Sequence, residues 1–282
     1  MKAKYRHIIF DADHTIIDFN EDERRAFRAA FADMLPFKAS TEPSIADIPP
    51  AKADMPPSKA DMTENAGIPP IDANIAHSNA GIPPSKEEFV LHMQAYSARN
   101  WQELGLNNVN DDVIRKAYHR LTYVHVHALF EHAKREWGLK NAAEAERTFY
   151  KTLCLPAHPM DGALEIIKAL SANYKVSVAT NGLSEMQNAR LKKFKPYFHR
   201  LFISEEVNAI KPSEEFGKTL LGTLQAGSDE CLFVGDSLTS DIALANKFTI
   251  DAVWYNPQGR PLPEGYRVIA QIKSLHELNR YI

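Results

Sequence analysis

Two carboxylates near the start of the chain, Asp11 and Asp13, follow the short apolar run of residues 8–10. Such a run is typical of a buried strand, and open α/β sheets bind their ligands beyond the carboxyl ends of their strands. Because side chains alternate along a strand, the chain has to turn after Asp11 for both carboxylates to reach one cleft. The pair is suited to chemistry in which one carboxylate attacks and the other moves a proton.

Three further polar motifs stand where predicted strands end. They are Thr180-Asn181-Gly182, Lys211-Pro212 and Gly235-Asp236-Ser237, the last followed by Asp241 on the next predicted helix. Each motif alone has an ordinary structural explanation as a turn or as the start of a helix. Their occurrence in this order, along alternating strands and helices, is far more specific and indicates a catalytic site.

These residue types match the needs of phosphoryl transfer, in which positioning and electrostatic stabilisation dominate. Asp11 is placed to be a covalent nucleophile, but it repels a phosphate unless a cation lies between them. Mg²⁺ prefers oxygen ligands, so we expect it to bind Asp11 and Asp236, with a further oxygen, such as a backbone carbonyl, at Asp13. Thr180 and Lys211 would hold the phosphate. Asp13 would protonate the leaving oxygen and later activate water.

The chain beyond about residue 157 alternates between strand and helix signals. The expected strands are residues 175–180, 201–204, 231–234 and 252–255, and the expected helices are residues 163–170, 184–194, 213–225 and 239–247. This alternation predicts an α/β protein with right-handed crossovers and a parallel sheet. The first strand, residues 8–10, has to join that sheet, because alone it could bury nothing.

Helical signals alone fill the region between the first strand and the rest of the sheet. The first helix is expected to begin at Asn20, with Glu23 as its capping-box partner. Further helices are expected from Ser85, from about Asp111 and over residues 142–153.

Residues 19–156 are therefore interpreted as a helical insertion, called the cap below, into a core made of residues 1–18 and 157–282. The cap is interrupted by residues 39–85, a proline-rich stretch with a seven-residue repeat. A seven-residue period can indicate a coiled coil, but the Pro-Pro pairs of this repeat are incompatible with a helix. We expect the stretch to be disordered or polyproline-like and exclude it from the fold.

Composition limits the kinds of partner. The formal net charge of −3 gives no general electrostatic case for binding a nucleic acid polymer or an anionic membrane. No apolar run approaches the roughly 20 residues that span a bilayer, and the start of the chain does not read as a secretory signal. The two cysteines, Cys154 and Cys231, make neither a disulfide framework nor a zinc site. A cytoplasmic protein is the simplest expectation.

The four motifs together resemble those of the haloacid dehalogenase-like (HAD) hydrolase superfamily, and the resemblance covers residues 1–18 and about 157–282. It implies a Rossmann-like core, a helical cap, Mg²⁺ and an aspartyl-phosphate intermediate. It also implies the roles of the individual residues: Asp11 as nucleophile, Asp13 as acid and base, Thr180 and Asn181 at the phosphate, Lys211 as charge stabiliser, Asp236 as metal ligand and Asp241 as a support of the metal site.

Two details of the first motif bear on this resemblance. Dehalogenases of the superfamily lack the second aspartate, because a halide leaving group needs no proton, so Asp13 favours hydrolysis of a phosphoester. His14 stands where the superfamily usually has Gly or a small or acidic residue, and we expect it to have a packing or loop role rather than a chemical one.

The substrate is less well defined than the reaction. The segment of residues 203–212 and the tail of residues 253–256 resemble the subgroup of pyrimidine 5′-nucleotidases and N-acylneuraminate-9-phosphate phosphatases. A nucleoside 5′-monophosphate is therefore the expected substrate, with a sugar phosphate as the alternative. Cap aromatics such as Trp101 are expected in the cap core, with stacking on a nucleobase as the alternative. A different class of function, in which the proline repeat binds a protein partner and the core is catalytically idle, is opposed by the intact motif residues.

Overall fold

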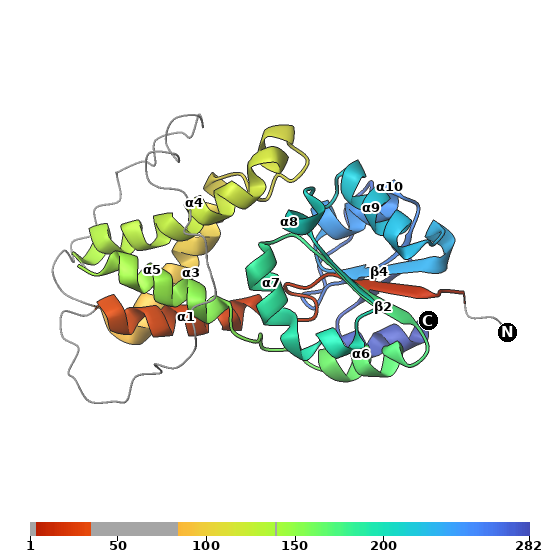
Figure 1. Ribbon diagram of the computed structural model, residues 1–282, viewed down its shortest axis with the longest axis horizontal. Coiled ribbons are helices and arrows are strands. Elements are labelled where there is room, and N and C mark those ends of the chain that lie inside the picture. Colours follow the sequence, from red (N-terminus) through yellow and green to blue (C-terminus); the bar gives the residue numbers. More distant parts are fainter. Residues whose placement is uncertain (1–3, 35–83, 139) are drawn as a thin grey trace.

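The computed structural model describes residues 4–34, 84–138 and 140–282 and contains one six-stranded parallel sheet (Figure 1). Its strand order is β3-β2-β1-β4-β5-β6. The strands are β1 (His7–Phe10), β2 (Lys175–Thr180), β3 (Arg200–Ile203), β4 (Cys231–Gly235), β5 (Asp251–Tyr255) and β6 (Ala270–Ile272). The predicted α/β class is confirmed, and the first strand lies in the middle of the sheet, hydrogen-bonded to both β2 and β4.

Both faces of the sheet are buried at its centre, which explains why β1 and β4 are almost entirely apolar. On β1, Ile8 and Phe10 point into one core cluster and Ile9 into the other. Figure 1 shows α6 (Ala163–Ser171) on one side and α9 (Glu214–Leu224) and α10 (Ala243–Lys247) on the other. The remaining helices of this part are α7 (Ser184–Arg190) and the short α8 (Ser204–Val207).

A separate apolar cluster holds the other helices together. These helices are α1 (Phe19–Met34), α3 (Lys86–Glu103), α4 (Asp112–Trp137) and α5 (Ala142–Leu153). Phe27 lies at the centre of this cluster, with ring centroids 4.6 Å from Phe149 and 6.3 Å from Phe89. This separate cluster supports our proposal that residues 19–156 form a cap on a core of residues 1–18 and 157–282. The proline-rich stretch lies outside the described residues, apart from its last two.

The helix starts after the repeat are as predicted. Ser85 forms a capping box with Glu88, and the carboxylate of Asp111 accepts hydrogen bonds from the first turn of α4. The start of α1 was predicted wrongly. Asp18, not Asn20, caps it, accepting from the amide of Glu21. Glu23 is instead buried and accepts a hydrogen bond from Ser97 Oγ, 2.6 Å away.

Three short elements of the core were not predicted as they are. Both α8 and β6 are new, and the expected helix over residues 239–247 is a π-helical turn, Leu238–Ile242, followed by α10. None of the helices in the described ranges is long and apolar enough to cross a membrane.

Candidate active site

The predicted motif residues meet at the carboxyl ends of three neighbouring strands. Asp11 directly follows β1, Thr180 is the last residue of β2 and Asp236 directly follows β4. Since β1 pairs with β2 on one side and β4 on the other, these three residues lie next to one another. Asp241 joins them from the π-helical turn that follows Asp236.

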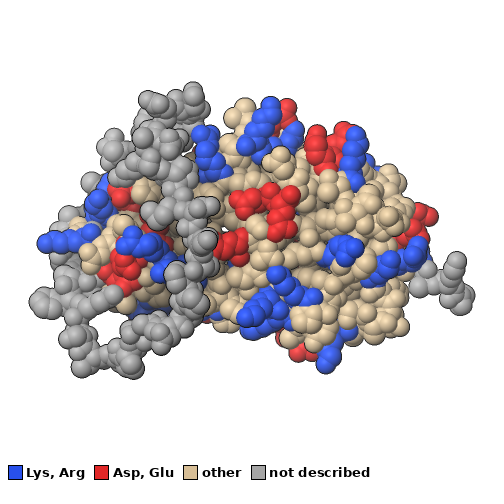
Figure 2. Space-filling model, viewed as in Figure 1, with Lys and Arg blue, Asp and Glu red and all other residues tan. Residues whose placement is uncertain are grey.

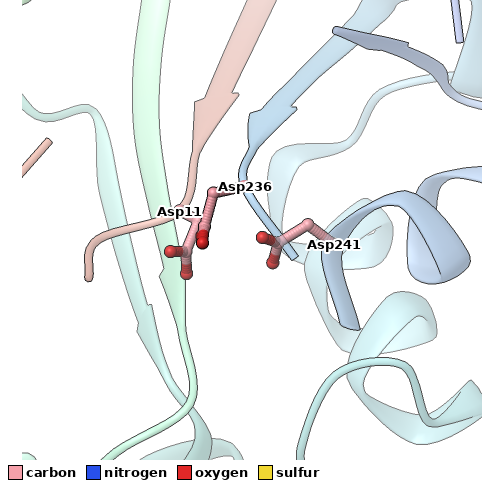
Figure 3. A group of neighbouring side chains, drawn as sticks. All are labelled: Asp11, Asp236 and Asp241. Carbon is pink, nitrogen blue, oxygen red and sulfur yellow. The ribbon is translucent and has the colours of Figure 1, made fainter. Parts of the chain in front are cut away.

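Asp11, Asp236 and Asp241 form a compact acidic group, with one carboxylate oxygen of each within 4.8 Å of the others (Figure 3). Gly235 makes this approach possible. A Cβ atom at this position would lie 2.4 Å from Oδ2 of Asp241, far inside van der Waals contact. The glycine before Asp236 is therefore required for close packing of the turn against the strand.

Lys211 is the cation that faces this acidic group. Its Nζ donates to Asp11 Oδ1 at 2.5 Å, to Asp241 Oδ1 at 2.7 Å and to the carbonyl of Ala179 at 2.6 Å. The side chain is 1% exposed. Burial opposes its charge, but Asp11 and Asp241 outweigh that effect and raise the pKa of Lys211, so the ammonium stays protonated.

The side chain of Asn181 holds the backbone at Lys211. Its Oδ1 accepts from the Lys211 amide at 2.8 Å and its Nδ2 donates to the Lys211 carbonyl at 3.0 Å. This pair of bonds fixes the point from which the long lysine side chain reaches the acidic group. The assignment of Asn181 to the substrate phosphate stays a prediction; the described contact of its side chain is with Lys211.

One ammonium group does not balance three clustered carboxylates. Burial, and then the neighbouring Asp241, raise the pKa of Asp11 well above its usual value and that of Asp236 to about 7. A raised carboxylate pKa means that the folded site favours less negative charge than it carries when fully ionised. An all-oxygen donor set with excess negative charge suits a hard divalent cation such as Mg²⁺.

Asp13 does not point into the acidic group. One oxygen, Oδ2, accepts from Gln187 Nε2 at 2.7 Å, and the other, Oδ1, forms an ion pair with Arg190 Nη1 at 2.6 Å. Gln187 Nε2 also donates to Thr180 Oγ1 at 2.7 Å. Neither of these α7 residues was predicted from the sequence, although their spacing of three places them on one face of the helix that follows the Thr180 motif.

His14 has a backbone role that fits the expectation. Its φ of 60° lies in the left-handed region, where glycine is the least strained residue. Its ring packs edge-on against Phe19, with 5.7 Å between centroids.

The cap reaches the core above this site. The cap helix α4 extends toward α8 (Figure 1), and His119 Nε2 lies 2.8 Å from Ser204 Oγ. Tyr118, the preceding residue, packs in a small apolar cluster with Ile210, the neighbour of Lys211. Burial, together with the nearby charge of Asp13, raises the pKa of the Tyr118 hydroxyl. The first half of α4 thus contacts the core beside the strand ends.

The parallel sheet, the inserted helices and the acidic strand ends define an α/β protein with a candidate metal site, and comparison with known proteins identifies its family. A family model described as haloacid dehalogenase-like hydrolase matches residues 5–249, so the chain belongs to that family.

Three curated proteins are similar in sequence to this chain. The chain is 29% identical over 202 residues to pyrimidine 5′-nucleotidase PynA of Streptococcus pneumoniae, covering 66% of this chain and 79% of PynA. It is 35% identical over 129 residues to pyrimidine 5′-nucleotidase YjjG of Escherichia coli, covering 44% of this chain and 56% of YjjG. It is 24% identical to the HAD hydrolase YfnB of Bacillus subtilis, over 98% of this chain and 94% of YfnB.

Solved structures show the same fold. That of YfnB, described as bound to magnesium and revealing interdomain movement, has a TM-score of 0.65 at 22% identity, covering 99% of this chain and 98% of YfnB. The L-2-haloacid dehalogenase RSc1362 has a TM-score of 0.63 at 15% identity, covering 99% of both chains. The same fold therefore occurs in a haloacid dehalogenase.

Proposed function

We propose that the protein is a Mg²⁺-dependent phosphatase that hydrolyses a small phosphomonoester, with a nucleoside 5′-monophosphate as the substrate class. The observation that carries the proposal is the meeting of Asp11, Lys211, Asp236 and Asp241 at the ends of adjacent strands, with Asp13 close by. The presence of Asp13 favours phosphoester hydrolysis over dehalogenation, because only an alkoxide-type leaving group needs a proton.

In the proposed reaction, a carboxylate oxygen of Asp11 attacks the phosphorus atom and forms an acyl phosphate. The bond from phosphorus to the ester oxygen breaks, and Asp13, which has to enter the cycle in its protonated form, gives that oxygen a proton. Asp13 then takes a proton from a water molecule that attacks the phosphorus atom, which releases inorganic phosphate and restores Asp11. The Lys211 ammonium group and the Thr180 hydroxyl bind the phosphoryl oxygens.

Mg²⁺ would be held by Asp11 and Asp236, with Asp241 in support and an additional oxygen at Asp13. Because the Asp13 side chain contacts Gln187 and Arg190, its backbone carbonyl is the group we assign to the ion. When bound, the cation offsets the charge of the carboxylates and of the phosphate. The magnesium described for the YfnB structure supports this assignment.

The similarity to PynA and YjjG supports a pyrimidine nucleotide as substrate. The cap face formed by the start of α4 carries Tyr118, which is buried in a small apolar cluster, and the half-buried His119, whose ring supplies polar atoms near the strand ends. We assign the base or sugar of the substrate to this face.

A screen of phosphorylated metabolites with Mg²⁺ and with EDTA tests the proposal. We expect uridine, cytidine or thymidine 5′-monophosphate to be hydrolysed with a kcat/KM well above that of any sugar phosphate, and only with Mg²⁺. Hydrolysis of sugar phosphates alone would replace the nucleoside monophosphate by a sugar phosphate as the substrate class. No hydrolysis of any phosphoester, including 4-nitrophenyl phosphate, would refute the phosphatase assignment.

A further inference from the structure

The carboxylate of Asp13 is held at both oxygens by two side chains of α7. Gln187 Nε2 donates to Oδ2, and Arg190 Nη1 lies 2.6 Å from Oδ1. Both α7 side chains are 1% exposed. A carboxylate offers about four lone-pair positions, so these two contacts fix its orientation and leave others for a substrate oxygen or water.

Arg190 also decides which way the Gln187 amide faces. Its Nη1 donates to Gln187 Oε1 at 3.1 Å, which leaves Nε2 to donate to Asp13 and to Thr180 Oγ1. If the amide were turned over, its oxygen would face the carboxylate. The two α7 residues therefore act as one unit, in which the guanidinium sets the amide and both hold the carboxylate.

Arg190 is fixed in turn by Asp22, in the first turns of α1. Its Nη2 lies 3.2 Å from Asp22 Oδ2. The other oxygen of Asp22 accepts from the backbone amide and from Nδ1 of His158, at 3.0 and 2.8 Å, and lies 3.3 Å from Arg25 Nη2. His158 belongs to the segment that returns from the cap helices to the core.

The two connections between cap and core meet at this point. The amide of Asp18 donates to the carbonyl of His158 at 2.8 Å, and Ile17 forms a bridge with Pro159. Arg190 thus joins Asp13 on the core side to Asp22 on the cap side through one buried cation.

We propose that Gln187 and Arg190 are positioning residues for Asp13, and that Asp22 sets the position of Arg190. This inference rests on the proposed function, because it assumes that Asp13 passes a proton to the leaving oxygen. Neither α7 residue is assigned a contact with substrate. Their effect on catalysis is the orientation of the Asp13 carboxylate, to which proton transfer is sensitive.

The test compares a substrate that needs the proton with one that does not. Uridine 5′-monophosphate has an alkoxide leaving group, whereas 4-nitrophenyl phosphate releases a stabilised phenolate. The ratio kcat/KM reports only steps through loss of the leaving group, so the later use of Asp13 as a base does not enter it.

The main variant is Gln187→Met, which keeps side-chain length and removes the amide. We expect it to lower kcat/KM for uridine 5′-monophosphate by about 10- to 100-fold, within the range of general acid catalysis. The loss for 4-nitrophenyl phosphate should be much smaller. The matched control is Asn188→Leu, which removes the next amide along the helix, bonded to Ser184 and Glu206 and not to the site. It should leave both ratios unchanged.

Equal losses on the two substrates would overturn the inference, because a displaced Thr180 or a loosened core harms both alike. No loss on either substrate would overturn it as well. If Gln187→Met does not fold, Arg190→Lys takes its place, since it keeps the charge and is expected to show the same selective loss.

A double-variant cycle supplies an independent readout. In an Asp13→Asn background, Gln187→Met should cause no further loss with uridine 5′-monophosphate, because its target is already disabled. A full additional loss would contradict the inference. Wild-type protein that hydrolyses neither substrate would instead refute the proposed function, and the inference with it.

Discussion

Asp236→Asn should make the metal-free protein more stable while it abolishes hydrolysis. The pKa of Asp236 is raised from 3.8 to about 7, first by burial and then by Asp241. At about 1.36 kcal/mol per pKa unit, three units correspond to at most about 4 kcal/mol of destabilisation when the carboxylate is ionised. The side chain is partly exposed, and solvent screening reduces the value, so we expect a gain of about 2 kcal/mol.

The direction of the pKa shift determines how the stability gain of Asp236→Asn depends on pH. A carboxylate whose pKa is higher in the folded state costs nothing below its unfolded pKa; its cost grows as the pH rises from the unfolded to the folded value and is complete above it. The advantage of Asp236→Asn should therefore be small near pH 4.5 and reach its full size near pH 8. Urea unfolding in EDTA, followed by tryptophan fluorescence, measures it at each pH.

Asp251→Asn is the matched control, because it makes the same chemical change at a carboxylate in the opposite situation. The hydrogen bond from Lys4, and then that from Tyr5, lower the pKa of Asp251, so its removal should reduce the free energy of unfolding, by up to about 1 kcal/mol at this partly exposed site. Addition of Mg²⁺ should stabilise the wild type and Asp251→Asn more than Asp236→Asn. An Asp236→Asn protein less stable than wild type in EDTA at pH 8 would refute the charge argument.

Three other predictions concern the same site and the repeat. Asp11→Asn should lower kcat for a nucleoside monophosphate by at least about 10³-fold, with an unchanged near-ultraviolet circular dichroism spectrum; retained turnover would exclude Asp11 as nucleophile. Lys211→Met leaves two buried carboxylates without their ammonium partner, so the free energy of unfolding, measured by urea titration, should fall by about 3–5 kcal/mol at pH 8 and by less at pH 5. An equal loss at the two pH values would count against this charge pairing. Deletion of residues 39–85 should leave turnover of 4-nitrophenyl phosphate largely unchanged, and a loss of turnover would assign the repeat a part in the site.

Much of the core could be predicted because its strands are buried on both faces. Apolar runs such as residues 231–234 then stand out from the polar helices between them. The strand β6 escaped notice because it has three residues and its middle one, Gln271, is exposed. The helix α8 has only four residues, too few for a periodic pattern.

The start of α1 shows where local reasoning fails. Asn20 with Glu23 and Asp18 with Glu21 are both acceptable capping patterns in the sequence. The structure selects Asp18 because the Asp18 amide is bonded to the returning chain at His158, which fixes where the helix can begin. Glu23 is then buried against Ser97, and burial raises the pKa of its carboxyl group to about 7. That contact, between residues far apart in the chain, has no local signal.

The difference between local patterns and long-range contacts also explains which site residues could be predicted and which were missed. Asp11, Thr180 and Asp236 were found because each directly follows a strand, and parallel pairing alone brings them together. Arg190 was not found, because its partners, Asp13 and Asp22, lie far from it in the sequence and only the folded chain brings them together. A fully buried guanidinium is tolerable only when it is paired, and Arg190 pairs with one carboxylate from the turn after β1 and one from α1. The positions of Asp13 and Asp22 therefore depend on each other, because a shift of either carboxylate changes how the Arg190 guanidinium is shared between them.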